Sequence, residues 1–290
     1  MSLKLQRSRE AEILELSNDV ADEDCRTGRV SPARICNAKD IKVAHNSYGI
    51  GRFDGMLVLS EGQWVILCNL DTGNSPGSTR ERFTIAHELG HYHIPEHRKQ
   101  LLAGCRSHGS YAGAFDGADS SEELEADTFA ANLLMPVDRF VRKLNYLRQT
   151  PLATIRALRQ EFDTSWESTA IQAMRHDARI ITIAKWKNDG FAWHRISEPA
   201  FKADGFRKFQ LRDMAALPRD SATAAALSDA DTGNDHRIHE GVLTAAHCFG
   251  WVAAGGKRDI LIREEAVRNG RFGVLSVFST LESPQNGTKR

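Results

Sequence analysis

The sequence has no excess of charge of either sign, because 38 Lys and Arg residues balance 38 Asp and Glu residues. A net charge of zero excludes attraction of the whole chain to nucleic acid or to an anionic membrane through bulk charge. No apolar run approaches the ~18 residues that a membrane-spanning helix needs. The N-terminal stretch MSLKLQRSREAEILELSNDV is charged and amphipathic, unlike a signal peptide. We therefore expect a cytoplasmic protein with no membrane partner.

Cysteine is scarce, odd in number and widely scattered. The five cysteines are Cys25, Cys36, Cys68, Cys105 and Cys248. This distribution argues against a disulfide framework and agrees with a reducing compartment. We expect most of these residues to be buried apolar side chains.

Histidine, in contrast, is concentrated in one short stretch, FTIAHELGHYHIPEH, which runs from Phe83 to His97. If this stretch is helical, His87 and His91 lie one turn apart on one face, and both imidazoles can reach one ion. Glu88 is next to the first histidine, where its carboxylate can act without ligating the ion. The H-E-x-x-H spacing is typical of a Zn²⁺ site in which the glutamate is the general base.

A catalytic zinc usually has three protein ligands, so a third ligand must lie elsewhere. His97 occupies the position of the third histidine in the metzincin pattern. That pattern requires a glycine between the ligands, and this chain has Ile94 followed by Pro95. We therefore predict that His97 is a surface residue.

The acidic segment SSEELEADTFAANLLMP, residues 120–136, offers the alternative. Glu123 and Asp127 are four residues apart and share a helix face, so one can bind the metal while the other accepts the ring N–H of a ligand histidine. Glu122 and Glu125 share their faces with apolar residues and offer no such second acceptor. The spacing therefore favours Glu123 as the third ligand and Asp127 as its supporting partner.

Three blocks of this chain resemble the ImmA/IrrE-type metallopeptidases. The blocks are DGMLVLSEGQWVILCN, STRERFTIAHELGHY and ELEADTFAANLLMP, within roughly residues 40–180. The resemblance implies zinc on His87, His91 and Glu123, with helix-turn-helix transcriptional repressors as substrates. Within the family, the layout is most similar to the CapP peptidases encoded beside CBASS anti-phage operons. The resemblance thus implies a peptidase that induces a defence or stress operon.

Cys105 lies in a glycine-rich loop between the two predicted ligand helices, close to Arg106 and His108. A thiolate is a strong zinc ligand, and neighbouring cations lower the pKa of a cysteine. Cys105 can therefore be an inhibitory ligand that takes the place of the attacking water, or an ordinary loop thiol.

The remaining pattern predicts an α+β protein with two domains. Residues 1–177 form a zincin-like, mostly helical peptidase domain with a small β-hairpin sheet around Glu61-Gly62, and residues 178–290 form a smaller α+β domain. A GAF-like sensor fold for the second domain is implied by the family resemblance. The stretch LPRDSATAAALSDADTGNDH, residues 217–236, reads as a flexible loop.

Two nucleic-acid interpretations stay open. Residues 151–176 have the pattern of a helix-turn-helix, so the rival function is a DNA-binding transcriptional regulator with a structural zinc. Charged and aromatic residues alternate in the predicted hairpin around Asn188-Asp189-Gly190, which also suits binding of single-stranded DNA as an activating signal. The residues are Lys185, Trp186, Lys187, Trp193 and Arg195. A half-exposed hairpin has the same pattern.

Overall fold

The computed structural model describes residues 5–104, 109–110, 121–187, 189–202, 209–213, 217–229, 237–249 and 260–281. These residues form eleven α-helices and two β-sheets, which confirms the mixed α+β class. The chain divides into two compact units, residues 1–142 with 160–165, and residues 143–159 with 166–290. The predicted domain boundary after residue 177, the zincin-like description and the GAF-like assignment stay predictions.

Unit 1 contains a four-stranded sheet in the order β1-β3-β2-β4. Its strands are β1 (Ile41–Asn46), β2 (Gly55–Ser60), β3 (Gln63–Asn69) and β4 (Gly109–Ser110). The predicted hairpin is present as β2 and β3, where Glu61 and Gly62 turn the chain with φ of 52° and 81°. Positive φ at both turn positions suits a tight two-residue hairpin. Beyond the predicted hairpin, β1 pairs with β3 in parallel.

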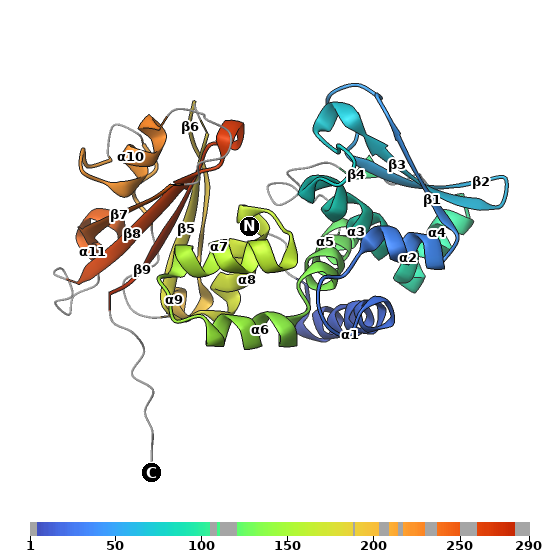
Figure 1. Ribbon diagram of the computed structural model, residues 1–290, viewed down its shortest axis with the longest axis horizontal. Helices are drawn as coiled ribbons and strands as arrows, with labels where there is room; N and C mark the ends of the chain where they lie inside the picture. The colour runs from blue at the N-terminus through green and yellow to red at the C-terminus, as the bar shows by residue number, and fades with distance from the viewer. Residues whose placement is uncertain are drawn as a thin grey trace, which may run out of the picture. The chain divides into compact units, whose positions relative to one another are not determined.

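One helix of unit 1, α5 (Ser121–Leu134), is buried along most of its length. The other helices of the unit are α1 (Arg7–Asp24), α2 (Pro32–Ala38), α3 (Thr79–His93), α4 (Pro95–Leu102) and α6 (Val137–Tyr146), the last of which crosses the unit boundary. α5 packs against both α1 and α3 (Figure 1). Its Phe129 and Leu133 are fully buried in a core shared with Ile66 of β3. Burial of each such side chain contributes about 1.5–3 kcal/mol.

Unit 2 contains a five-stranded antiparallel sheet in the order β6-β5-β9-β8-β7. The strands are β5 (Ile180–Lys187), β6 (Gly190–Ile196), β7 (Ile238–Thr244), β8 (Leu261–Arg268) and β9 (Val274–Thr280). The helices are α7 (Pro151–Phe162), whose last three residues belong to unit 1, α8 (Trp166–His176), α9 (Glu198–Lys202), α10 (Ala222–Ser228) and α11 (Ala245–Phe249). The hairpin predicted after residue 177 is confirmed as β5 and β6.

Two adjacent buried glutamates of β8 place helices on both faces of this sheet. Glu264 accepts hydrogen bonds from the backbone N–H groups of Ala222 and Thr223 at the start of α10. Glu265 accepts one from the N–H of Leu152 at the start of α7. Neighbouring residues on a strand point to opposite faces, so the pair fixes one helix on each side. The predicted flexible loop at 217–236 is therefore wrong in part, because α10 forms there.

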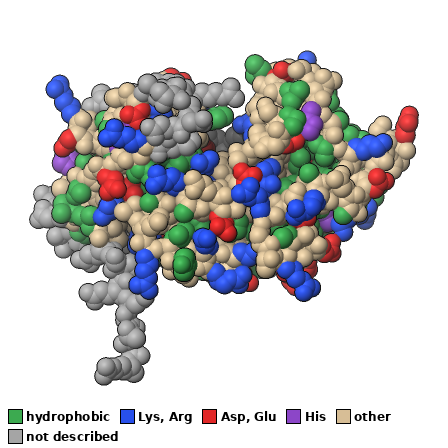
Figure 2. All heavy atoms as spheres, in the orientation of Figure 1, with side chains coloured by type: hydrophobic (Ala, Val, Ile, Leu, Met, Phe, Trp, Pro, Cys, Tyr) green, Lys and Arg blue, Asp and Glu red, His purple; other side chains and the backbone are tan. Residues whose placement is uncertain are grey.

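Acidic and basic side chains are interspersed on the face drawn in Figure 2, in keeping with the balanced composition. Of the helices that the structure describes, none is both long enough and apolar enough to cross a membrane.

The buried Glu264 carboxyl leads to a prediction about pH. Burial raises the pKa of Glu264 above its ordinary value of 4.5 despite its hydrogen bonds to Thr223 and Ala222. As the pH rises above 4.5, the unfolded chain ionises this group before the folded chain does. The free energy of unfolding therefore falls until the pH passes the raised pKa of the folded state.

We expect Glu264→Gln to make the free energy of unfolding, measured by urea denaturation, less dependent on pH above 4.5. Glu240→Gln on the neighbouring strand β7 is the matched control, because the Glu240 side chain is 54% exposed. An equal pH dependence in wild type and Glu264→Gln would contradict the assignment.

Candidate metal centre

α3 carries the histidine block, and a capping residue, Ser78, precedes its first turn. The Ser78 side chain accepts a hydrogen bond from the backbone N–H of Glu81, which satisfies one of the free donors of the first helical turn. The helix then continues through His93. His87 and His91 lie on one face of it and are 3% and 1% exposed. The predicted helical spacing of the two histidines is therefore present.

A glycine lets the second helix approach α3 closely. A Cβ atom on Gly90 would lie 3.1 Å from the Cα and 3.2 Å from the carbonyl oxygen of Ala126 on α5. Both contacts are with backbone atoms, which cannot move aside without shifting the helix. The close approach brings Glu123, in the first turn of α5, alongside the two histidines.

His87, His91 and Glu123 form a cluster that could hold a metal ion, with their ligand atoms within 4.8 Å of one another. His87 Nε2 lies 3.1 Å from His91 Nε2 and 3.2 Å from Glu123 Oε2, and His91 Nε2 lies 3.5 Å from Glu123 Oε1. Ligands about 2.1 Å from a tetrahedral zinc are separated by roughly 3.4 Å. The three donors therefore match the size and chemistry of a zinc site.

The outer nitrogens of the two imidazoles also have partners. His87 Nδ1 lies 2.9 Å from Asp127 Oδ1, and His91 Nδ1 lies 3.2 Å from His97 Nδ1. Burial lowers the pKa of His87, but hydrogen bonds to Asp127 and Glu123 outweigh burial and raise it well above its ordinary value. The same negative surroundings favour a bound cation.

Glu88 lies beside the cluster without being one of its three members. Its side chain is completely buried, and strand β2 passes directly over it at Gly55. A Cβ atom on Gly55 would lie 2.8 Å from Glu88 Oε1 and 2.5 Å from Thr84 Cγ2. Only a glycine at this position leaves the space that the Glu88 carboxylate fills.

One sequence-based prediction about a neighbouring residue is wrong. His97 is 2% exposed and contacts His91, so it is not a surface residue. Glu125 Oε2 lies 3.2 Å from His97 Nε2, which is within ion-pair distance. The histidine spacing in H-x₅-H, from His91 to His97, was the available signal. Cys105 lies outside the described residues.

Two histidines and a glutamate on two packed helices define the site as a candidate metallopeptidase centre. The comparison with known families agrees with this class. Residues 36–174 match the peptidase family model described as the IrrE N-terminal-like domain. This match supports the ImmA/IrrE family for that part of the chain.

A solved structure, a Mycobacterium tuberculosis transcriptional regulator, is similar to this chain with a TM-score of 0.53 and 13% identity. The similarity covers 95% of this chain and 89% of that one, and it concerns the fold. No curated protein matches the sequence significantly.

The geometry predicts an order of metal affinities. Glu123→Ala removes one of three donors, so we expect it to abolish high-affinity zinc binding. Asp127→Ala removes only the partner of His87 and should weaken binding by ~10–100-fold. Glu122→Gln is the control, because Glu122 is not one of the three donors and its Oε1 accepts a hydrogen bond from Gln100 at 2.8 Å. Titration of the metal-free protein against a zinc chelator measures all three. Equal losses in the control and in Glu123→Ala would contradict the assignment.

Proposed function

We propose that this protein is a zinc-dependent endopeptidase, with His87, His91 and Glu123 as zinc ligands and Glu88 as the general base. The observation that carries the proposal is the position of Glu88, a buried carboxylate next to a metal-sized cluster that already has three donors. A purely structural zinc site does not require such a group. The match to a peptidase family supports the same conclusion.

Zinc held by these residues would polarise the scissile carbonyl and increase the acidity of the attacking water. The Glu88 carboxylate takes the proton from that water and returns it to the nitrogen of the leaving amine. Asp127 keeps a proton on His87 Nδ1, so that Nε2 presents its lone pair toward the cluster. Gly55 leaves the carboxylate the room that its position requires.

The proposed substrate is a helix-turn-helix transcriptional repressor, whose cleavage would induce a neighbouring defence or stress operon. The family resemblance of the three sequence blocks supports this substrate class and the comparison with CBASS-associated peptidases. The inhibitory role of Cys105 stays a sequence-based prediction.

Activation by single-stranded DNA also stays a prediction. Of the five hairpin residues that suggested it, two are buried. Lys185 is 4% exposed and lies against Glu167, and Trp186 is completely buried. Neither side chain is available for stacking or phosphate contact. Lys187 at the end of β5 is exposed, and Trp193 and Arg195 on β6 are partly exposed, so these three residues could still contact a nucleic acid.

The rival function, a DNA-binding regulator, has less support from the same residues. α8 would be the recognition helix of the predicted helix-turn-helix. Its residues Trp166 and Ser168 through Gln172 are buried, on more than one face of the helix. A recognition helix must present a face to the major groove. The structural neighbour described as a transcriptional regulator is similar in fold only.

The first test is to incubate the purified, zinc-loaded protein with the repressor whose gene lies next to its own, and to measure cleavage of that repressor. Glu88→Gln should keep zinc affinity close to wild type and lower the cleavage rate by ~10²–10⁴-fold, because an amide cannot take the proton. Mass spectrometry of the fragments and zinc titration give the two readouts. Cleavage at a normal rate by Glu88→Gln would contradict the assigned role, and Glu122→Gln controls for a change of charge.

The second test concerns the placement of Glu88. Gly55→Ala should displace the carboxylate and lower the cleavage rate by about 100-fold while zinc remains bound, since a shift of about 1 Å has such an effect. Thr84→Ser removes the methyl group that would clash at 2.5 Å and keeps the hydroxyl that donates to Asn74. Thr84→Ser alone should therefore be nearly normal. Full activity of Gly55→Ala/Thr84→Ser would show that the clash with Glu88 is unimportant.

A further inference from the structure

The two candidate histidine ligands differ in what supports them. His87 Nδ1 faces a carboxylate directly, at 2.9 Å from Asp127 Oδ1. His91 Nδ1 instead faces a second imidazole, at 3.2 Å from His97 Nδ1. Two imidazole nitrogens share a hydrogen bond when one carries a proton and the other presents a lone pair. The direction of this bond therefore decides which nitrogen of His91 is free for a metal.

The surrounding atoms assign that direction. His91 Nε2 points into the cluster, 3.1 Å from His87 Nε2, so it must keep its lone pair for the metal. The proton of His91 is then on Nδ1 and is donated to His97 Nδ1. His97 must in turn carry its proton on Nε2, which lies 3.2 Å from Glu125 Oε2. This arrangement places the ring proton of His91 on Nδ1 and the ring proton of His97 on Nε2.

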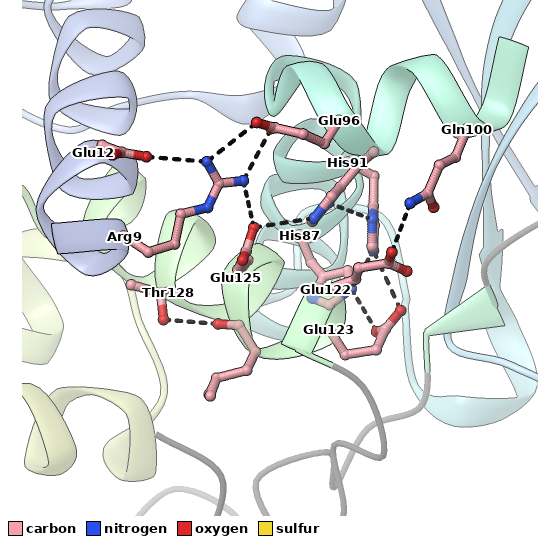
Figure 3. A network of polar contacts seen from close by, with 12 residues as sticks. Arg9, Glu12, His87, His91, Glu96, Gln100, Glu122, Glu123, Glu125 and Thr128 are labelled. Atoms are coloured by element: carbon pink, nitrogen blue, oxygen red, sulfur yellow. Dashed lines mark hydrogen bonds and ion pairs between the residues drawn. The ribbon is translucent and has the colours of Figure 1, made fainter. Parts of the chain in front are cut away.

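The chain of contacts ends on the first helix. Arg9 Nη2 on α1 lies 2.7 Å from Glu125 Oε2 and 2.9 Å from Glu96 Oε2. Figure 3 shows the Arg9 guanidinium between Glu125, Glu96 and Glu12, which come from α5, α4 and α1. A charge-assisted bond from a planar guanidinium fixes the orientation of a carboxylate. Glu125 is thereby held with one oxygen toward His97.

We propose that Arg9, Glu125 and His97 are positioning residues that hold His91 in the tautomer and orientation needed for metal binding. This inference rests on the proposed zinc site. Arg9 lies outside residues 36–174, the range matched by the peptidase family model. The N-terminal helix α1 therefore contributes to the affinity of a metal site whose three donors all lie on α3 and α5.

The test is the zinc dissociation constant of the full-length protein, measured by chelator competition. We expect His97→Ala to weaken zinc binding by ~10–100-fold, as removal of a supporting partner usually does. Arg9→Met and Glu125→Gln should weaken it by less than the ~10-fold expected for loss of a direct partner, because both act on His91 only through His97. Glu122→Gln, one residue before the ligand Glu123 and outside these contacts, should match wild type.

His97→Asn provides a rescue variant. Its side-chain oxygen can take the place of His97 Nδ1 and accept the proton of His91, so most of the zinc affinity should return. Because the shorter amide no longer depends on Glu125, adding Arg9→Met to His97→Asn should change nothing further. A general loss of packing would not produce this pattern, because the two effects would then add.

A second readout uses the metal-free protein. Long-range proton–nitrogen NMR spectra should show His91 protonated on Nδ1 and His97 on Nε2. A His97 protonated on Nδ1, or unchanged zinc affinity in both His97→Ala and Arg9→Met, would overturn the proposal. A wild-type protein without zinc affinity would overturn both this inference and the proposed function. A protein that binds zinc with the expected order of affinities but cleaves nothing would contradict the peptidase function alone.

Discussion

The contact between α3 and α5 at Gly90 is the constraint on which the candidate metal centre depends. Helix axes in proteins usually lie 8–10 Å apart, and the separation depends on the side chains at the contact. Here a hydrogen atom faces the backbone of Ala126, and a methyl group would already lie 3.1 Å from it. At this short separation Glu123 lies within 3.2 Å of His87 Nε2 and 3.5 Å of His91 Nε2.

Bringing the helices together also buries several ionisable groups, and each of them needs a partner. α5 distributes its acidic residues accordingly. Glu123 and Asp127 face the histidines of α3, whereas Glu125 faces His97 of α4 and Arg9 of α1. Removing one member of such a network leaves a buried charge or dipole without compensation, which is why single substitutions here should have large effects.

Unit 2 uses buried carboxylates in a different way. Glu264 and Glu265 are adjacent on β8 and point to opposite faces of the sheet, where each accepts backbone N–H groups at the start of a helix. They act as anchors between a strand and two helices, and the sheet they occupy also buries Lys185 against Glu167. Lys185, which the sequence suggested as a nucleic-acid contact, is thus a buried ion-pair partner within the unit.

The sequence by itself determined the local features of this protein. The four-residue spacing of His87 and His91 and the Glu61-Gly62 turn both act between near neighbours, so periodicity and turn chemistry predict them. The spacing of Glu123 and Asp127 also placed both side chains on one face of α5. The three resembling blocks added the expectation that His87, His91 and Glu123 hold zinc.

Only the tertiary structure decided the features that join distant segments. Arg9 and Glu125 are 116 residues apart, and the burial of His97 depends on α1, α4 and α5 meeting at one point. The parallel pairing of β1 with β3 and the anchoring of α10 by Glu264 have the same origin. Side-chain partners across such separations are fixed by packing and close approach, and a single sequence carries no local pattern that encodes which distant groups will meet.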